Sequence, residues 1–129
     1  MNIGLQNEIT IQVTQERTAK AMGSGKLAVF ATPAMIALME QTAAESVENL
    51  LGEGKTSVGT LMNAEHLAAT PVGMKVICKS IMTAIEGRKL VFEIEAYDEV
   101  GLIGKAHHER FTVDAERFLE KAYNKADLS

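Results

Sequence analysis

The sequence lacks the features that mark several common classes of protein. A single cysteine, Cys78, excludes an intramolecular disulfide and is typical of a reducing compartment. There is no tryptophan and the net charge is −4, so the stacking side chains and basic surface that bind nucleic acid are missing. No apolar run approaches the roughly 20 residues that cross a bilayer, and the start, MNIGLQNEIT, does not resemble a secretion signal. We therefore expect a cytoplasmic protein that binds neither nucleic acid nor a membrane.

What the sequence does contain is enough for a folded core. Its 129 residues are 47% hydrophobic and 23% charged, a composition that supports one domain with a buried interior. No linker, low-complexity tract or repeat longer than a tripeptide divides the chain. We expect residues 1–129 to form a single domain.

The first third of the chain predicts a strand and a long helix. Residues 7–16 alternate between apolar and polar side chains, as a half-buried strand does, and residues 15–22 fit a short helix. Thr32 and Pro33 fit the N-cap and first position of a helix over 34–51, which ends at the glycines of GEGK.

The rest of the chain predicts four strands and a final helix. The strands are expected within 57–66, 73–85, 90–98 and 105–114, joined by tight turns. In the first of them, strict alternation would place Val58, Thr60, Met62, Ala64 and His66 on one face, towards the helix. A charged helix should follow Asp114, with Phe118, Leu119 and Ala122 on its inner side.

These elements define a fold class. Tight turns imply antiparallel pairing, and a single apolar helix on an antiparallel sheet is an α+β arrangement. The predicted fold is the hotdog: an antiparallel β-sheet wrapped around one long central helix, with a short C-terminal helix. One helix leaves the edge of the sheet free, and a free edge needs a partner. We expect a homodimer through edge strands, and the pairing of dimers into a tetramer is left open.

Glu40 stands out in the long helix. At 100° per residue it projects from the middle of the apolar arc, among Ile36, Met39 and Val47. Helix faces are rarely uniform, so its carboxylate could simply reach solvent or a surface lysine. The functional alternative is a carboxylate in a low-dielectric cleft, where desolvation raises its pKa and makes it a better base or proton donor near neutrality.

Thr32 and His66 are the next candidates, and each has a structural alternative. Thr32 fits an N-cap, but a helix N-terminus with its free N–H groups also suits a developing oxyanion. His66 ends a strand and could be a packed or surface residue. If it shares the helix-facing side of its strand, its imidazole could exchange a proton with Glu40.

Other residues give weaker signals. Gly59 fits a bulge in a strand, or a close approach of substrate to the backbone. His107 and His108 are adjacent on a strand and point to opposite faces, so they cannot bind one metal together, and no cluster has the spacing of a metal site. Glu109 and Arg110 are interpreted as a structural ion pair.

Four blocks of sequence, taken in order, resemble one known family. VFATPAMIALMEQTA, VGT…EHLAATPVG, EGRKLVFEIEAYD and GKAHHERFTVD are similar to blocks of the fluoroacetyl-CoA thioesterase-like family of hotdog proteins, over roughly residues 5 to 125. The resemblance implies a catalytic set of Thr32, Glu40 and His66. It also associates Gly59 and Arg110 with substrate binding.

The resemblance implies an acyl-CoA thioesterase that hydrolyses a small acyl-CoA to the free acid and CoA at a dimer-interface cleft. No metal and no cofactor is expected, because coenzyme A is part of the substrate. Several basic residues are candidates for the CoA phosphates: Lys75, Lys79, Arg88, Lys89 and Lys105. The alternatives are a non-catalytic acyl-CoA-binding module of the same fold and an enoyl-CoA hydratase.

The chain departs from the family in residues 15–30. The fluoroacetyl-specific enzyme has aromatic residues that form a lid over the acyl group, whereas this segment contains only Phe30. We therefore expect a different small acyl group.

Overall fold

A computed structural model describes residues 1–128 of the chain. Its strands are β1 (Gln6–Gln12), β2 (Lys55–His66), β3 (Lys75–Glu86), β4 (Lys89–Tyr97) and β5 (Leu102–Asp114), and its helices are α1 (Ala19–Met22), α2 (Thr32–Val47) and α3 (Ala115–Tyr123). Short 3₁₀ turns occupy Gln15–Arg17, Glu48–Leu50 and Asn124–Leu128. Within the described part of the chain, no helix is long and apolar enough to span a membrane.

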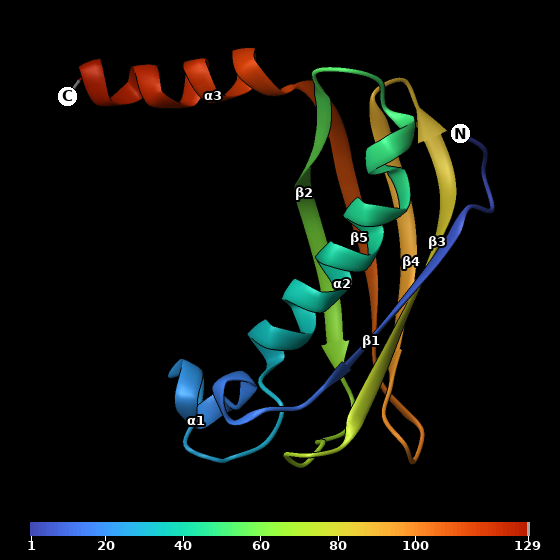
Figure 1. Cartoon of the computed structure of the whole chain (residues 1–129), viewed down its shortest axis with the longest axis vertical. Helices are drawn as coiled ribbons and strands as arrows, with labels where there is room; N and C mark the ends of the chain where they lie inside the picture. The colour runs from blue at the N-terminus through green and yellow to red at the C-terminus, as the bar shows by residue number, and fades with distance from the viewer. Residues whose placement is uncertain (129) are drawn as a thin grey trace.

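The five strands form one antiparallel sheet in the order β1-β3-β4-β5-β2, and α2 lies across one face of it in contact with all five (Figure 1). This is the predicted hotdog arrangement. The prediction of a tight turn between β2 and β3 is wrong. Residues 67–74 instead carry the chain past the start of α2, where the Phe30 N–H donates to the Thr70 carbonyl at 2.9 Å. The strand β2 therefore lies at one edge of the sheet and β1 at the other.

The core lies between α2 and the sheet, and its position shows that α2 is rotated from the predicted orientation. Met35, Leu38 and Ala43 are buried, and so is Thr42, whose hydroxyl donates to the Leu38 carbonyl at 2.7 Å. Because that bond satisfies the hydroxyl, a polar residue can face the core. Glu40 consequently lies at the rim of the buried arc, with 44% of its side chain exposed.

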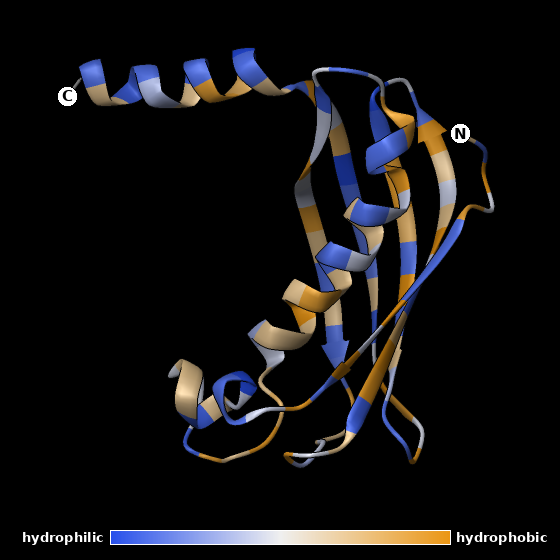
Figure 2. Ribbon diagram, viewed as in Figure 1, coloured by the Kyte–Doolittle hydropathy of each residue, from blue (hydrophilic) through white to orange (hydrophobic). Residues whose placement is uncertain are grey.

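The alternation of β2 is interrupted by a bulge. Gly59 pairs with Arg110 and Leu61 with Glu109, which leaves Thr60 as an extra residue. The Thr60 hydroxyl donates to the Glu109 backbone on the exposed side, so the prediction that Thr60 shares a face with Met62 is wrong. Figure 2 shows the alternating apolar and polar residues along the neighbouring strands.

The helix α3 does not fold back on the sheet as predicted. It begins with an Asp114 cap, whose carboxylate accepts from the Arg117 N–H at 3.1 Å. It then projects away from the body, past the β2 edge (Figure 1), and none of the residues Ala115–Tyr123 is buried. The expected inner side is exposed: Phe118 by 45% and Leu119 by 57%.

Candidate active site

The start of α2 lies beside the end of β2, and this contact joins two of the predicted residues. The N-cap of α2 is Ala31, so the expectation that Thr32 caps the helix is wrong. Thr32 is the first residue of the helix, and its Oγ1 lies 2.7 Å from Nδ1 of His66. The hydroxyl is therefore available to the imidazole instead of to the helix backbone.

The imidazole of His66 is held in an apolar setting. The Phe30 ring meets it edge-on, with 6.4 Å between the ring centroids. Its Nε2 is buried and, among residues 1–128, has no hydrogen-bond partner. Desolvation lowers the pKa of His66, and the nearby Ala68 backbone offsets this only in part. The ring is therefore neutral at neutral pH and can accept a proton from the Thr32 hydroxyl through Nδ1.

A pocket of about 300 Å³ opens beside this pair. It is lined by Ala19, Ser24, Val29, Phe30, Thr32, His66, Leu67, Ala68 and Ala69. Apart from Phe30 and Leu67, the apolar lining residues are small. The pocket thus offers a short apolar space next to a hydroxyl–imidazole pair.

A second cluster surrounds the Arg110 side chain on β5. The guanidinium donates to Ser57 Oγ at 2.8 Å, to the Ser57 carbonyl at 3.0 Å and to Nε2 of His108 at 3.1 Å. Glu40 contributes the nearest carboxylate, whose Oε2 is 4.0 Å from Nη1. Burial lowers the pKa of Arg110, but the charges of Glu40 and Glu48 oppose that change. Arg110 is thus a buried cation held mainly by neutral groups.

Gly59 lies at the centre of this cluster. A Cβ at this position would lie 2.8 Å from Glu40 Oε2, 3.2 Å from His108 Cε1 and 3.3 Å from Arg110 Nη1. All three distances are shorter than ordinary van der Waals contact. The glycine therefore keeps open the space between the carboxylate and the guanidinium.

His108 is a site residue that the sequence reasoning missed. It is 1% exposed, and its Nδ1 donates to the Leu61 carbonyl at 2.7 Å. Desolvation lowers the pKa of His108, so the ring is neutral and its Nε2 accepts from Arg110. The signal was available, because His108 and Arg110 are two positions apart on a strand and must share a face.

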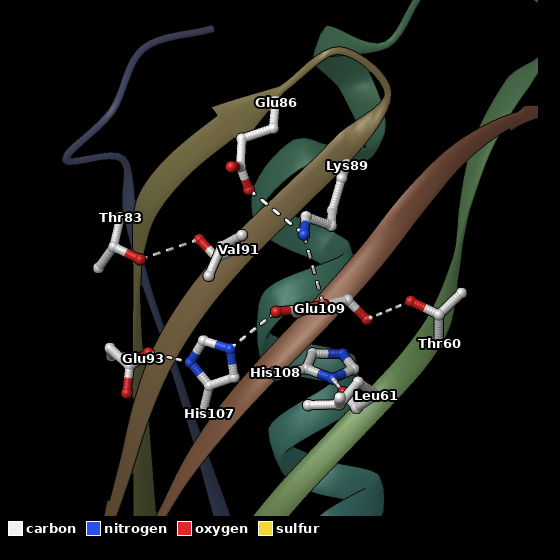
Figure 3. Close-up of polar contacts among 10 residues, drawn as sticks. All are labelled: Thr60, Leu61, Thr83, Glu86, Lys89, Val91, Glu93, His107, His108 and Glu109. Carbon is white, nitrogen blue, oxygen red and sulfur yellow. Dashed lines mark hydrogen bonds and ion pairs between the residues drawn. The ribbon is translucent and has the colours of Figure 1, made fainter.

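The opposite face of β5 carries a separate polar network (Figure 3). His107 lies between the carboxylates of Glu93 and Glu109, and Glu109 also pairs with Lys89 at 3.9 Å. The predicted Glu109–Arg110 ion pair is therefore wrong, because the two side chains point to opposite faces of the sheet. The same alternation confirms that His107 and His108 diverge. Among residues 1–128, no group of three or more ligand side chains could hold a metal ion.

The two clusters are separate within one chain. Thr32 and Glu40 are eight residues apart on α2, or about 12 Å along the helix axis. Gly59 and His66 are seven residues apart on β2, or about 24 Å. The structure brings Thr32 to His66, and it brings Glu40 to Gly59 and Arg110, but it does not bring the two groups into contact.

Comparison with known proteins gives consistent matches. The sequence model of a family described as Fluoroacetyl-CoA-specific thioesterase matches residues 13–116. The fluoroacetyl-CoA thioesterase of Streptantibioticus cattleyicolor is 37% identical over 97 residues, which cover 75% of this chain and 70% of that protein.

Solved structures agree with the sequence matches. A crystal structure of the fluoroacetyl-CoA-specific thioesterase FlK superposes with a TM-score of 0.91 at 30% identity, covering 97% of each chain. FlK structures include complexes with fluoroacetate, with fluoroacetate and CoA, and with acetyl-CoA. A thioesterase superfamily member from Thermus thermophilus matches with a TM-score of 0.89 at 26% identity, covering 99% of this chain and 97% of that one.

Proposed function

We propose that this chain, which belongs to the fluoroacetyl-CoA-specific thioesterase family of thioester hydrolases, hydrolyses a short acyl-CoA to the free acid and CoA. The observation that carries the proposal is the 2.7 Å contact between Thr32 Oγ1 and a neutral His66, beside an apolar pocket. A hydroxyl paired with a neutral imidazole is the arrangement that nucleophilic and general-base catalysis both use.

In this mechanism His66 moves the proton. It accepts the proton of the attacking hydroxyl, which belongs to Thr32 or to a water molecule that Thr32 or the Glu40 carboxylate holds. The new C–O bond forms as the carbonyl oxygen gains negative charge, and free N–H groups at the start of α2 stabilise that charge. The C–S bond then breaks, and His66 returns the proton to the leaving thiolate. If Thr32 is the nucleophile, an acyl-Thr32 ester remains, and a water molecule attacks it while His66 again accepts the proton. The C–O bond to Thr32 then breaks, the Thr32 oxygen takes the proton back, and the free acid leaves.

The acyl group would be small and would occupy the pocket beside Thr32. The pocket walls include Ala19, Val29 and Ala68, and Phe30 is the one aromatic residue among the nine that line it. Phe30 is 1% exposed and packs on His66, so it is part of the wall of the pocket and not a lid. This favours a short acyl group other than fluoroacetyl.

We further propose that the complete site forms between two copies that pair through their β2 edges. In an antiparallel pair centred on the middle of β2, His66 of one copy lies opposite residue 55 of the other. It is then about four residues, or 14 Å, from that copy's Gly59, compared with about 24 Å within one chain. Pairing would therefore bring the Thr32–His66 pair of one copy towards the Glu40–Gly59–Arg110 cluster of the other.

The test is release of free thiol, measured with Ellman's reagent, from acyl-CoAs ranging from acetyl to hexanoyl, plus fluoroacetyl-CoA. The protein itself gives little background, because burial raises the pKa of Cys78 to about 11. Glu40→Gln and His66→Ala should each lower turnover by about 10²–10⁴. Glu45→Gln, on the exposed side of α2, is the matched control and should leave turnover unchanged.

Wild-type turnover in both Glu40→Gln and His66→Ala would refute this mechanism. An acyl-CoA that raises the melting temperature of the protein without any release of thiol would favour the non-catalytic binding module instead.

A further inference from the structure

Within residues 1–128, the helix α3 makes little contact with the rest of the protein. Its backbone is joined to the body by the Ala115 N–H, which donates to the Gly54 carbonyl at 3.0 Å, and nothing in Ala115–Tyr123 is buried. Helices of this length are marginal in water without tertiary packing. Three large apolar side chains on it are nonetheless exposed: Phe118, Leu119 and Tyr123, the last by 73%. An amphipathic helix in this state indicates a missing partner surface.

A groove of about 660 Å³ lies between α3 and the adjacent end of the sheet. Leu51, Val113 and Phe118 supply its apolar surface. The same groove is lined by four cations, Lys55, Arg88, Arg117 and Lys121, and by two carboxylates, Asp114 and Glu120, so its charge is net positive. Among residues 1–128, Lys55 is the one of these cations that forms an ion pair, with Asp114 at 3.9 Å. The groove therefore combines an apolar surface with a basic rim, and its occupant should be apolar and acidic.

We propose that the occupant is the opposite end of a second copy of this chain, so that α3 of each copy packs on the turns around Leu67 and Leu102 of the other. The proposal rests on the β2-edge dimer described above. Antiparallel pairing of β2 places the Lys55 end of one strand beside the His66 end of the other. In Figure 1, α3 leaves the sheet at the Lys55 end and extends past the β2 edge, into the position where the second copy would lie.

The side chains at the His66 end of the sheet are complementary to the groove in polarity and charge. Large apolar side chains are exposed there: Leu67 by 50%, Val100 by 87% and Leu102 by 37%. Glu65 precedes His66, the last residue of β2, and pairs with Lys105 at 3.9 Å. Glu99 lies in the turn between β4 and β5 and accepts from the Lys75 N–H at 2.9 Å, so carboxylates flank the apolar residues. The apolar side chains match Phe118 and Leu119, and the carboxylates match the basic rim.

The packing would also complete a binding site. Leu67 lines the pocket that holds Thr32 and His66. A helix α3 packed on Leu67 would form an outer wall of the other copy's pocket. Each copy would thus contribute α3 to the acyl site of its partner, in addition to the β2 edge.

Disulfide crosslinking tests this placement. We would introduce Phe118→Cys together with one of Leu67→Cys, Val100→Cys or Leu102→Cys. Within one chain, Phe118 and Leu67 are at opposite ends of β2, which spans about 37 Å, so a disulfide cannot form there. At least one pair should therefore give a covalent dimer on mild oxidation. The native Cys78 is buried and should not interfere.

Two controls define the result. Phe118→Cys with Ile3→Cys tests random collision, because Ile3 is 64% exposed and lies beside the β3 side of the sheet. Phe118→Cys alone tests whether α3 pairs with α3. Crosslinking of that single variant, or of none of the three pairs, would overturn the proposal. If light scattering still shows a dimer in the second case, the dimer forms without α3 in this position.

A second measurement avoids oxidation. Phe118→Ser combined with Leu119→Ser should raise the dimer dissociation constant by at least about tenfold, because each side chain would lose its apolar burial. Ile3→Ser is the matched control and should leave it unchanged. An unchanged dissociation constant in the double variant would refute the packing. Failure of the wild-type dimer to release thiol from any acyl-CoA would concern the catalytic proposal alone.

Discussion

Replacing Gly59 with alanine should separate the catalytic role of its cluster from the stability of the fold. The new methyl group would be 2.8 Å from Glu40 Oε2, about 0.6 Å inside an ordinary contact, and 3.2 Å from His108 Cε1. Glu40 is the group that can move, because 44% of its side chain is exposed and its carboxylate ends a flexible chain. The His108 ring cannot move in the same way, because its Nδ1 donates to the Leu61 carbonyl. The carboxylate should therefore swing towards solvent.

The expected magnitudes differ for the two readouts. Moving an exposed carboxylate should cost no more than the lower end of an overpacking penalty, about 1 kcal/mol, or about 3–5 °C in melting temperature for a chain of this size. Turnover should fall about 10²-fold, because Glu40 would leave Arg110 and lose its position in the site. Thermal unfolding and thiol release on the same preparation measure both.

Gly101→Ala is the matched control for this experiment. Gly101 has no atom within 4 Å of an added Cβ, and its backbone is not in the left-handed region. This substitution should change neither the melting temperature nor the turnover. Wild-type turnover in Gly59→Ala, with an unchanged melting temperature, would show that the position of the Glu40 carboxylate does not matter for the reaction.

Three further predictions follow from other contacts. Gly104→Ala should destabilise the protein by about 1–3 kcal/mol in urea unfolding, because its Cβ would be 2.5 Å from the buried Met35 sulfur and 3.0 Å from backbone. The acid limb of the pH profile of kcat/KM should have its midpoint below 6.5, because desolvation lowers the pKa of His66 and its neutral form is required; a midpoint above 6.5 would contradict this. Hydrogen bonds to Glu109 and Glu93 raise the pKa of His107. The wild-type protein should therefore be more stable than His107→Gln below pH 6.5, and this difference should decline as pH rises through the raised pKa. Urea unfolding of both proteins measures the difference, and a pH-independent value would argue against the ion pair.

Much of the fold was predictable because its longest elements have unambiguous patterns. The helix α2 and the alternating β4 each repeat their period over enough residues to fix their type. Placing His66 on the helix-facing side of β2 predicted that its imidazole could exchange a proton with Glu40, but the structure puts the imidazole beside Thr32 instead. The placement of His66 on the helix-facing side is right, but the reasoning behind it is not. It counted alternate residues from Val58 through Thr60 as if β2 had no bulge.

The parts that failed depend on contacts that a single sequence does not display. The rotation of α2 depends on the bond from Thr42 to its own backbone, which allows a polar residue to be buried. The route from β2 to β3 depends on where residues 67–74 find hydrogen-bond partners. An amphipathic pattern in α3 indicates an apolar face, but it does not say whether the same chain or another copy covers it. Each failure concerns which partner is used, not which element forms.

The bulge at Thr60 has a consequence for how this site can change by insertion and deletion. Gly59 and His66 are seven positions apart, an odd number, so a regular strand would turn them to opposite faces. The extra residue restores them to the same face, towards α2. Loss of one residue together with the bulge would leave them six positions apart, an even number, and a regular strand would keep both on that face. Loss of one residue with the bulge retained would instead turn one half of the site outwards. A chimera that exchanges β2 must therefore keep the odd spacing and the bulge together, or change both.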